Sequence, residues 1–427
     1  MNGPIPWRLK CVECDTLYRG HEIRYRCDCS GTLDVITTLA AATSEPLLET
    51  FDARRSSFIP ADVSGVWRFR ELVLPLSPDE VVTKGEGNTA LYDASPLEDF
   101  TGVADLRLKH EGENPTGSFK DRGMTVGVSV AKSLGCERVA CASTGNTSAS
   151  MAAYAAQAGM RAFVFIPEGK IAFGKLSQAL AYGARTIQIP GDFDDAMKLV
   201  ERVCVDEGIY LLNSVNPFRI EGQKAIGLEL MQDLRWRAPD WIVLPGGNLG
   251  NNTAIAKGLL ELRDLGLIDR LPRMAVIQAE GANPLYTAWR DGTDVQPLTA
   301  ETLATAIRIG SPVSWRKSLR GIRALNGVVE QVSDQEILEA KARVDAAGIG
   351  AEPASCATVA GVRKLCHAGV IRPDDQVCGV LTGHLLKDPD TVVRFHRGQL
   401  EGIDSGVAAN PPVTSDGTLE DVRRLLQ

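Results

Sequence analysis

Residues 137–167 read ERVACASTGNTSASMAAYAAQAGMRAFVFIP, and this stretch decides the fold. Its two apolar runs, 137–143 and 160–167, have the length and residue types of buried strands. The alanine-rich segment 148–159 between them is typical of a helix. A strand, a helix and a second strand in direct succession predict two parallel strands joined by a crossover helix.

The same alternation continues along the chain. It predicts further strands at 184–190, 240–245, 273–280 and 376–382, and helices at 194–208 and 252–266. The fold class that follows is α/β, with a parallel sheet covered by helices. Because ligands gather at the carboxyl ends of parallel strands, the loops that follow these strands are the candidates for a functional site.

The composition is that of a soluble globular protein. The chain has 427 residues, of which 44% are hydrophobic and 23% charged, and its formal net charge is -8. This length predicts two or three domains. The negative charge argues against a general nucleic-acid binder or a protein of anionic membrane surfaces. No apolar run approaches the roughly 18 residues that span a bilayer. The start, MNGPIPWRLKC, lacks the apolar core of a signal peptide, so we expect a cytoplasmic protein.

The ten cysteines fall into two groups. Cys11 and Cys14 form one close pair and Cys27 and Cys29 another, which is typical of four thiolates around a structural zinc. A metal-free β-hairpin that merely keeps these cysteines is the alternative. The other six lie singly in apolar segments and are expected in the core of a reduced protein: Cys136, Cys141, Cys204, Cys356, Cys366 and Cys378.

One lysine lies in a setting suited to covalent chemistry. Residues 113–123 read ENPTGSFKDRG, in which a turn sequence precedes Ser118 and Asp121, a pair that predicts a helix N-cap and a helix to about residue 132. Lys120 then lies in the first helical turn, where the helix dipole disfavours a further positive charge. Such an amine loses its proton more readily and can form a Schiff base with a carbonyl. An ordinary surface lysine beside an Asp–Arg pair is the alternative.

A glycine-rich loop follows the strand at 240–245. It consists of Gly246, Gly247, Asn248, Leu249 and Gly250, and a helix comes directly after it. Glycines let the backbone approach an anion, and the helix start offers free N–H groups, so the loop predicts a phosphate cradle. It matches neither the P-loop nor the dinucleotide pattern. A glycine-rich turn without a ligand is the alternative.

Three more strand-end segments carry polar groups. Residues 143–148, STGNTS, open a helix and predict a site for a carboxylate or a phenolic oxygen. Residues 213–219, NSVNPFR, end on a guanidinium suited to phosphate. Thr382 places a hydroxyl at the tip of the last strand, and we expect His384 to be a local hydrogen-bonding residue.

The lysine, the phosphate cradle, the carboxylate site and the strand-end hydroxyl together describe a pyridoxal phosphate site.

The motifs that carry this site occur in a familiar order. NPTGSFKDRG, ASTGNTSAS, NSVNPFRIEGQK, LPGGNLGN, AEPAS and LTGHLLKDP together resemble the threonine synthases, which are fold-type II pyridoxal phosphate enzymes. The resemblance implies two three-layer αβα domains with parallel-rich sheets. The large cofactor-binding domain is expected at 41–139 and 226–427, and a small mobile substrate domain at 140–225. Residues 1–40 would form a small zinc-ribbon-like β segment.

The resemblance also implies roles for single residues. Lys120 would form the Schiff base and move protons, Asn146 would bind the phenolic oxygen of the cofactor, and Thr382 would face its ring nitrogen. Gly246, Gly247, Asn248, Leu249 and Gly250 would hold the cofactor's phosphate. The substrate carboxylate would bind Ser143, Thr144 and Thr147, and the substrate phosphate would bind Asn213, Ser214 and Arg219.

Three departures from the family pattern bear on these roles. Leu249 stands in the cofactor loop where relatives often have glycine, and we expect a negative φ there, since leucine tolerates little else. Leu385 likewise replaces a frequent glycine beside the ring nitrogen. The second cysteine pair reads Cys27-Asp-Cys29-Ser-Gly in place of a Cys-Gly-Gly ending, which bears on zinc binding.

The reaction that the resemblance implies converts O-phospho-L-homoserine and water to L-threonine and phosphate, the work of a carbon–oxygen lyase acting on phosphate. The resemblance to this family also implies a homodimer, with the small molecule O-phospho-L-homoserine as its substrate. Several alternatives stay open from the residues alone. They are a cysteate synthase, a serine or threonine dehydratase, a synthase recruited to a specialised pathway, and a catalytically silent scaffold with a zinc-ribbon interaction module.

Overall fold

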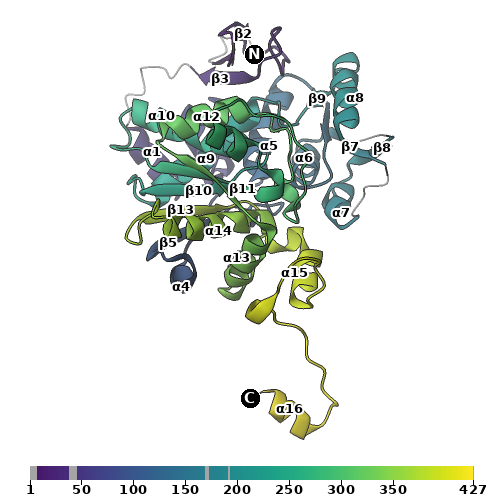
Figure 1. Ribbon diagram of the computed structural model, residues 1–427. Coiled ribbons are helices and arrows are strands. Elements are labelled where there is room, and N and C mark those ends of the chain that lie inside the picture. The colour runs from purple at the N-terminus through teal and green to yellow at the C-terminus, as the bar shows by residue number, and fades with distance from the viewer. Residues whose placement is uncertain (1–6, 38–45, 169–172, 191–192, 427) are drawn as a thin grey trace.

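The computed structural model describes residues 7–37, 46–168, 173–190 and 193–426, and these contain three sheets (Figure 1). The strands are β1 (Trp7–Cys11), β2 (Leu17–Arg19), β3 (Leu33–Thr37), β4 (Leu91–Asp93), β5 (Asp105–His110), β6 (Arg138–Ala142), β7 (Arg161–Pro167), β8 (Arg185–Ile189), β9 (Tyr210–Leu211), β10 (Trp241–Pro245), β11 (Arg273–Ala279), β12 (Val328–Val332) and β13 (Gln376–Leu381).

Helices connect and cover these strands. The α-helices are α1 (Leu47–Arg54), α2 (Pro60–Val63), α3 (Arg70–Val73), α4 (Glu98–Thr101), α5 (Lys120–Ser133), α6 (Asn146–Gln157), α7 (Phe173–Ala181), α8 (Phe193–Asp206), α9 (Phe218–Asp233), α10 (Gly250–Asp264), α11 (Pro284–Asp291), α12 (Trp315–Ala324), α13 (Asp334–Ala346), α14 (Pro353–His367), α15 (Pro389–His396) and α16 (Leu419–Leu425). Short 3-10 turns are η1 (Trp67–Phe69), η2 (Ser95–Leu97), η3 (Glu111–Glu113), η4 (Glu280–Ala282), η5 (Thr305–Ile307), η6 (Leu385–Lys387) and η7 (Gly406–Ala408).

The largest sheet has six strands in the order β12-β11-β10-β13-β5-β4. Its pairs are parallel except β4 with β5. Along β10, Trp241 and Val243 join the hydrophobic core under α14, whereas Ile242 and Leu244 join the core on the opposite face, where α9, α10 and α12 pack. A strand buried on both faces needs apolar residues at every position, which explains the unbroken run WIVLP.

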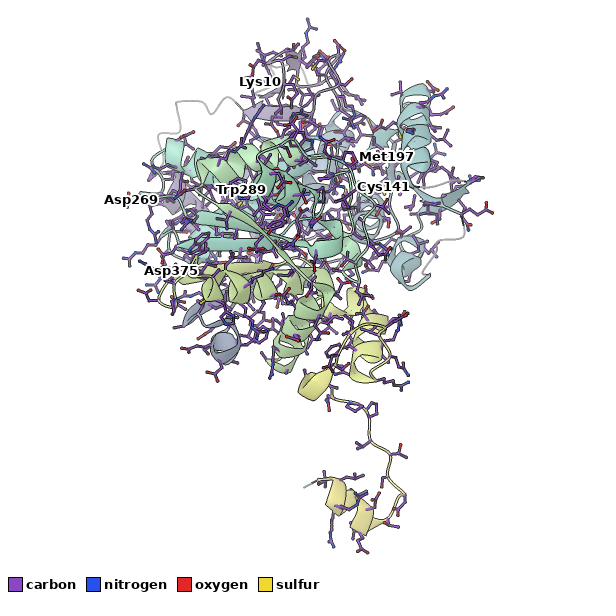
Figure 2. All side chains as sticks on the ribbon, in the orientation of Figure 1. Lys10, Cys141, Met197, Asp269, Trp289 and Asp375 are labelled. Carbon is purple, nitrogen blue, oxygen red and sulfur yellow. The ribbon has the colours of Figure 1, made fainter. Side chains whose placement is uncertain are left out.

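The second sheet is parallel and has four strands in the order β8-β7-β6-β9. Along β6, Val139 and Cys141 share a core with residues of α5, α6 and α9, while Ala140 and Ala142 pack with residues of α8. Figure 2 labels Cys141 and Met197 in this layer, beside the larger sheet. The core that contains Ile242 of the large sheet also contains Val139, so the two sheets share one hydrophobic core.

The third sheet is the antiparallel ribbon β2-β1-β3, which lies against the large sheet's helices. Lys317 Nζ of α12 donates to Leu33 O and to Asp34, and Lys257 Nζ of α10 donates to Val35 O. These contacts anchor the ribbon. At the other end of the molecule, α16 lies away from the body at the end of an extended segment (Figure 1).

The predicted fold class is confirmed, with several local corrections. All six strand regions named from the sequence pattern form strands in the α/β body, and the helices predicted at 148–159, 194–208 and 252–266 form within two residues of their expected ends. The pattern does not single out β5 or β12, whose sequences DLRLKH and VVEQV mix charged with apolar residues. Cys136 and Cys366 are half-buried rather than in the core.

The predicted N-cap at Ser118 is wrong. The helix α5 begins at Lys120, and the Ser118 hydroxyl is buried without a hydrogen-bond partner in the described chain. Asp121 orders the turn in its place, because its carboxylate accepts from the amide and the hydroxyl of Thr116 at 2.7 and 2.6 Å. In the described ranges, no helix is long and apolar enough to cross a membrane.

Candidate active site

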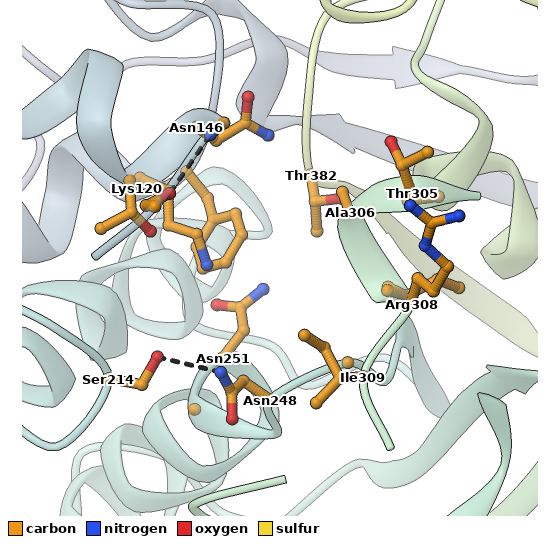
Figure 3. A pocket seen from close by; sticks show the side chains of 18 of the residues that line it. Lys120, Asn146, Ser214, Asn248, Asn251, Thr305, Ala306, Arg308, Ile309 and Thr382 are labelled. Carbon is orange, nitrogen blue, oxygen red and sulfur yellow. Dashed lines mark hydrogen bonds between the residues drawn. The ribbon is translucent and has the colours of Figure 1, made fainter. Parts of the chain in front are cut away.

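A cavity of about 1360 Å³ lies at the carboxyl ends of strands from both parallel sheets. Figure 3 shows Lys120, Asn146, Ser214, Asn248 and Thr382 facing this space. Nearly all site residues predicted from the sequence line it, which are Lys120, Ser143, Thr144, Asn146, Thr147, Asn213, Ser214, Arg219, Gly247, Asn248, Leu249, Gly250 and Thr382. Five loops from distant parts of the chain therefore meet here, as strand-end geometry predicts.

Gly246 is the exception. It does not line the cavity, and its amide donates to Ile277 O of β11 at 2.7 Å. This N–H group continues the sheet ladder and is not free for a ligand. A side chain at residue 246 would lie 2.6 Å from Val276, so glycine is required here by packing.

Lys120 has the chemistry expected of a nucleophilic amine. Its pKa is lowered to about 7, first by burial and then by the positive charge of Arg219, while the Glu352 carboxylate acts in the opposite direction. The lowered pKa agrees with the prediction, although burial is the main cause. Since an amine with a pKa near 7 is about half unprotonated at neutral pH, Lys120 is competent to attack an aldehyde.

Backbone hydrogen bonds hold the lysine turn against the tip of β13. Phe119 N donates to Thr382 O at 3.0 Å, and His384 N donates to Gly117 O at 3.0 Å. These bonds hold the backbone of the lysine turn beside the backbone of Thr382. His384 has the local role that was expected of it, because its Nδ1 accepts from Leu386 N at 3.2 Å.

The loop after β10 fits a phosphate group. Within the described chain, the amide groups of Gly247 through Asn251 donate to no internal acceptor, and they lead directly into α10. The loop shape is fixed by Asn248, whose Oδ1 accepts from Val313 N at 2.9 Å and whose Nδ2 donates to Ser214 Oγ at 3.1 Å. A set of unpaired N–H groups at a helix start is an anion site.

Leu249 departs from expectation. A negative φ was expected, but its φ is +63°, in the left-handed region. Its side chain is only 2% exposed and lies against Gly246, 3.2 Å from where a side chain there would begin. Burying a leucine is worth about 1.5–3 kcal/mol, which offsets a left-handed backbone cost of roughly 1–2 kcal/mol. Packing therefore explains how leucine replaces glycine here.

Arg219 provides a cation on the small-sheet side of the cavity. It is 3% exposed, and burial lowers its pKa to about 10. Its Nη1 donates to Leu212 O at 3.1 Å, and within the described ranges its Nε has no partner and the guanidinium pairs with no carboxylate. A buried guanidinium without an acid partner is suited to an anionic ligand.

Asn213 and Ser214 are placed differently from each other. Both polar groups of the Asn213 amide bond to the backbone of Ala142, at 2.8 and 3.0 Å, so this side chain mainly joins β9 to β6. The Ser214 hydroxyl instead faces the glycine loop through Asn248. Ser143, Thr144 and Thr147 line the cavity at the start of α6, beside Asn146.

Two lining residues were not singled out from the sequence. Asn251 is buried, and neither atom of its side-chain amide has a partner among the residues that the structure describes, although it belongs to the same polar loop as Asn248. Glu352 lies in the AEPAS motif, and its Oε2 accepts from Asn146 Nδ2 at 3.2 Å. The orphaned amide of Asn251 was detectable from its place in the loop, whereas the place of Glu352 depends on tertiary structure.

The four N-terminal cysteines converge. The sulfur atoms of Cys11, Cys14, Cys27 and Cys29 all lie within 4.8 Å of one another. A side chain at Gly31 would lie 2.8 Å from the Cys11 sulfur, so this glycine makes room for the cluster. Four thiols at such spacing fit a tetrahedral metal ion with no open coordination position.

Comparison with known proteins identifies the family. The family model described as "Pyridoxal-phosphate dependent enzyme" matches residues 82–383. The threonine synthase of Methanosarcina acetivorans is 49% identical over 91% of this chain and 94% of its own. The chain belongs to the threonine synthase family of pyridoxal-phosphate dependent enzymes.

A second relative and a solved structure support this family assignment and this fold. The threonine synthase of Methanocaldococcus jannaschii is 46% identical over 90% of this chain and 94% of its own. The crystal structure of threonine synthase from Escherichia coli superposes with a TM-score of 0.67 at 17% identity, covering 98% of this chain and 99% of that one. At this low sequence identity, the superposition is evidence for the fold alone. The predicted family, the fold-type II class and the cofactor are confirmed.

Proposed function

We propose that this chain is a threonine synthase that converts O-phospho-L-homoserine and water to L-threonine and inorganic phosphate. The names of its relatives support this, at 46–49% identity over nine-tenths of the chain. The observation that carries the proposal is a pair of separate anion-binding features in one cavity, the unpaired amides of Gly247–Asn251 and the unpaired guanidinium of Arg219. A cofactor phosphate needs only one of them, which leaves the other for a phosphate of the substrate.

The residues of the cavity fit pyridoxal phosphate. Lys120 would hold its aldehyde carbon, the amides from Gly247 to Gly250 its phosphate, Asn146 its phenolic oxygen and Thr382 its ring nitrogen. When bound, this cofactor supplies an electron sink for a carbanion next to the substrate's amino group.

Lys120 would also move the protons. When it is not bound to the cofactor, the Lys120 amine, whose pKa is about 7 in the chain alone, would be suited both to accept and to return a proton at neutral pH. The polar groups of Ser143, Thr144 and Thr147 at the start of α6 would orient the substrate carboxylate. Ser214 and Arg219, with Asn213 holding their loop, would bind the leaving phosphate and stabilise its charge.

Closure of residues 140–225 over the cavity would exclude water between these steps. Contacts across the mouth support such a motion. Lys387 Nζ of η6 donates to Gln178 Oε1 of α7, and Gln178 Nε2 donates to Thr116 O at 3.3 Å. These polar contacts join the small-sheet side to the lysine turn at the mouth of the cavity.

The ribbon at 1–40 would bind a structural zinc through Cys11, Cys14, Cys27 and Cys29. Elemental analysis of purified protein, with a variant in which Cys14 and Cys27 are serine as control, measures the metal directly. One zinc per wild-type chain and none in the variant is expected. A cytoplasmic location and a homodimer also belong to this proposal.

The test of the proposed reaction is a parallel assay of the pyridoxal phosphate-loaded enzyme. The substrates are O-phospho-L-homoserine, O-phospho-L-serine with sulfite, and L-threonine, and both phosphate and the organic product are quantified. Threonine from the first substrate is expected. Cysteate from the second, or a keto acid from the third, with no turnover of phosphohomoserine, would instead make this a cysteate synthase or a dehydratase.

A further inference from the structure

The N-terminal ribbon carries an arginine that lines the active-site cavity. Arg26 lies between β2 and β3, directly before Cys27 of the sulfur cluster, and its backbone pairs with Thr32 as an isolated antiparallel bridge. Its side chain is exposed, and it lines the cavity together with residues of both parallel sheets. The proposed function gives the ribbon a structural metal and leaves Arg26 without a role.

The ribbon is attached to both sides of the cavity. On the large-sheet side, Lys317 Nζ of α12 donates to Leu33 O of β3 at 2.6 Å. On the small-sheet side, Tyr25 Oη accepts from Leu211 N of β9 at 2.7 Å, and its ring packs edge-on against Tyr210 with the ring centroids 5.9 Å apart. The ribbon therefore connects the helices of the large sheet with β9 of the small one (Figure 1).

Tyr25 determines which part of the cavity Arg26 lines. Because β9 is the edge strand of the small sheet, Leu211 N has no partner within the sheet, and the Tyr25 hydroxyl supplies one. The Tyr25 side chain packs in the same apolar cluster as Val215 and Met197, and both of these residues line the cavity. Arg26 is the next residue in the chain, so it lines the cavity beside the loop that follows β9.

The same strand end holds the arginine already proposed to bind the substrate phosphate. Arg219 Nη1 donates to Leu212 O at 3.1 Å, and Tyr25 accepts from the amide of the preceding residue, Leu211. Two segments far apart in the chain are thus tied to consecutive residues at the end of β9, and each brings a guanidinium to the cavity.

The charge of Arg26 is uncompensated within the described chain. Five lysine and arginine side chains of the described residues line the cavity, and these are Arg26, Lys120, Arg219, Arg308 and Lys387. Lys387 donates to Gln178, and Arg308 pairs with Glu301 at 3.5 Å. In the described ranges Arg26 forms no ion pair, and its guanidinium makes one long hydrogen bond, from Nη1 to Ser30 O at 3.5 Å. Such a guanidinium is available to a phosphate group.

We propose that Arg26 is a phosphate-binding residue at the mouth of the cavity, a second guanidinium that meets the phosphate group of the substrate as it enters beside Arg219. This inference rests on the proposed function, in which the substrate carries a phosphate ester. A guanidinium matches phosphate oxygens through two parallel N–H···O bonds. The ribbon then contributes a side chain to the active site in addition to its cysteine cluster.

Exposure separates the task of Arg26 from that of Arg219. Arg219 is 3% exposed, so its contact with a phosphate forms only after both groups have lost their water. Arg26 is exposed and hydrated, so it attracts the phosphate before the final complex forms, and salt screens this attraction. Charges at the rim of a binding site act mainly through the rate of association and its salt dependence.

The test compares Arg26→Gln with a matched control, Arg19→Gln, which removes an exposed arginine of β2 in the same ribbon but outside the cavity. Both variants lose one positive charge, so they differ only in where the charge lay. The readouts, on pyridoxal phosphate-loaded enzyme, are the dissociation constant of inorganic phosphate by titration calorimetry and the values of kcat and kcat/KM for O-phospho-L-homoserine. Each is measured at ionic strengths that give Debye lengths of about 30 Å and about 3 Å.

At low ionic strength we expect Arg26→Gln to weaken phosphate binding and to lower kcat/KM about two- to fivefold, the range of an exposed ion pair. The value of kcat and the absorption spectrum of the bound cofactor should stay unchanged, and both losses should shrink at high ionic strength. Arg19→Gln should change none of these readouts. Unchanged phosphate binding in Arg26→Gln, equal losses in the two variants, or no phosphate binding by wild type would overturn the proposal.

A conservative variant tests whether the charge itself is responsible. Arg26→Lys keeps the positive charge and should retain most of the phosphate affinity and its salt dependence. A loss as large as that of Arg26→Gln would contradict the proposal.

The phosphate titration needs no turnover, so it separates this inference from the proposed function. If wild type does not turn over phosphohomoserine, the proposed function fails, and the titration still decides whether Arg26 binds phosphate. If wild type forms threonine but Arg26→Gln binds phosphate as wild type does, only the role of Arg26 fails.

Discussion

Two buried arginines on neighbouring helices have opposite surroundings. Arg122 of α5 is fully buried, and its Nη2 lies 2.6 Å from Glu111 and 2.9 Å from Glu229. Arg219 of α9 is almost as buried, but among the described residues its guanidinium donates only to a carbonyl oxygen, Leu212 O. The pKa of Arg122 is raised by its two carboxylates, whereas burial lowers the pKa of Arg219 to about 10.

This difference in surroundings indicates that the charge of Arg122 stabilises the fold, whereas the charge of Arg219 is suited to bind a ligand. Arg122 belongs to a closed cluster in which Arg68 and Lys109 also pair with Glu229, so each buried charge is compensated within the chain. Arg219 lines the cavity with its charge uncompensated. A buried cation with no partner is costly unless a ligand supplies the opposite charge.

The largest effect is expected at Lys120, whose pKa is lowered in part by the charge of Arg219. Lys120→Ala removes the amine that would bind the cofactor and carry protons, so turnover of phosphohomoserine should fall by at least about 10²–10⁴-fold, the range for acid–base catalysis alone. Rate measurements with saturating cofactor check this. Unchanged turnover would contradict the assignment of Lys120 as the catalytic residue.

Arg122→Ala should cause the next largest effect, on stability. It leaves Glu111 and Glu229 buried with fewer partners, and we expect the free energy of unfolding to fall by about 3–5 kcal/mol. Urea denaturation measures the loss. Arg107→Ala, which removes a half-exposed arginine paired with Asp105, is the control and should change stability by less than about 1 kcal/mol.

Arg219→Ala should lower activity and leave stability intact, the opposite of what we expect for Arg122→Ala. We expect kcat/KM for phosphohomoserine to fall by the equivalent of about 2–5 kcal/mol, because a buried charge contact to phosphate is lost. The free energy of unfolding of the apoenzyme should stay unchanged or rise, since an uncompensated charge is removed. A stability loss as large as that of Arg122→Ala would place Arg219 in the structural class.

A smaller effect is expected at Leu249, which replaces glycine in the phosphate loop. Leu249→Gly relieves a left-handed backbone worth roughly 1–2 kcal/mol but removes a buried side chain worth about 2–5 kcal/mol in leucine truncations. We therefore expect a net loss of stability of about 1–2 kcal/mol with cofactor binding retained. A stabilised variant would mean that backbone strain outweighs packing here.

A pH dependence of the apoenzyme's stability is also expected. The pKa of Lys120 is about 7 in the folded chain and near 10.5 in the unfolded chain, so the unfolded state binds more protons between these values. Stability from this group then rises with pH across that window. The difference in unfolding free energy between wild type and Lys120→Met should grow in favour of wild type from pH 7 to pH 10. A flat difference would contradict the lowered pKa.

Sequence reasoning succeeded where a role follows from position after a strand. The loops at 143–148, 213–219 and 246–250 were identifiable because strand order brings the carboxyl ends together, and each lines the cavity. The family order of motifs then assigned the cofactor, which the comparisons confirm.

Sequence reasoning could not predict features of the site that depend on residues far away in the chain. Arg122 and Arg219 look alike in sequence, and they differ only because Glu229, 107 residues from Arg122, folds against one of them. The left-handed Leu249 depends on the space beside Gly246, and the place of Glu352 depends on a strand tip 30 residues away. Packing sets all three, and no local pattern encodes it.

The most direct test of the central claim is the stoichiometry of a single turnover experiment. The cofactor-loaded enzyme is mixed with O-phospho-L-homoserine, and phosphate and L-threonine are quantified in the same quenched samples. We expect both to form at equal rates, with Arg219→Ala slowing them together. Phosphate released without threonine, or no phosphate released at all, would contradict the assignment of the cavity to threonine synthesis.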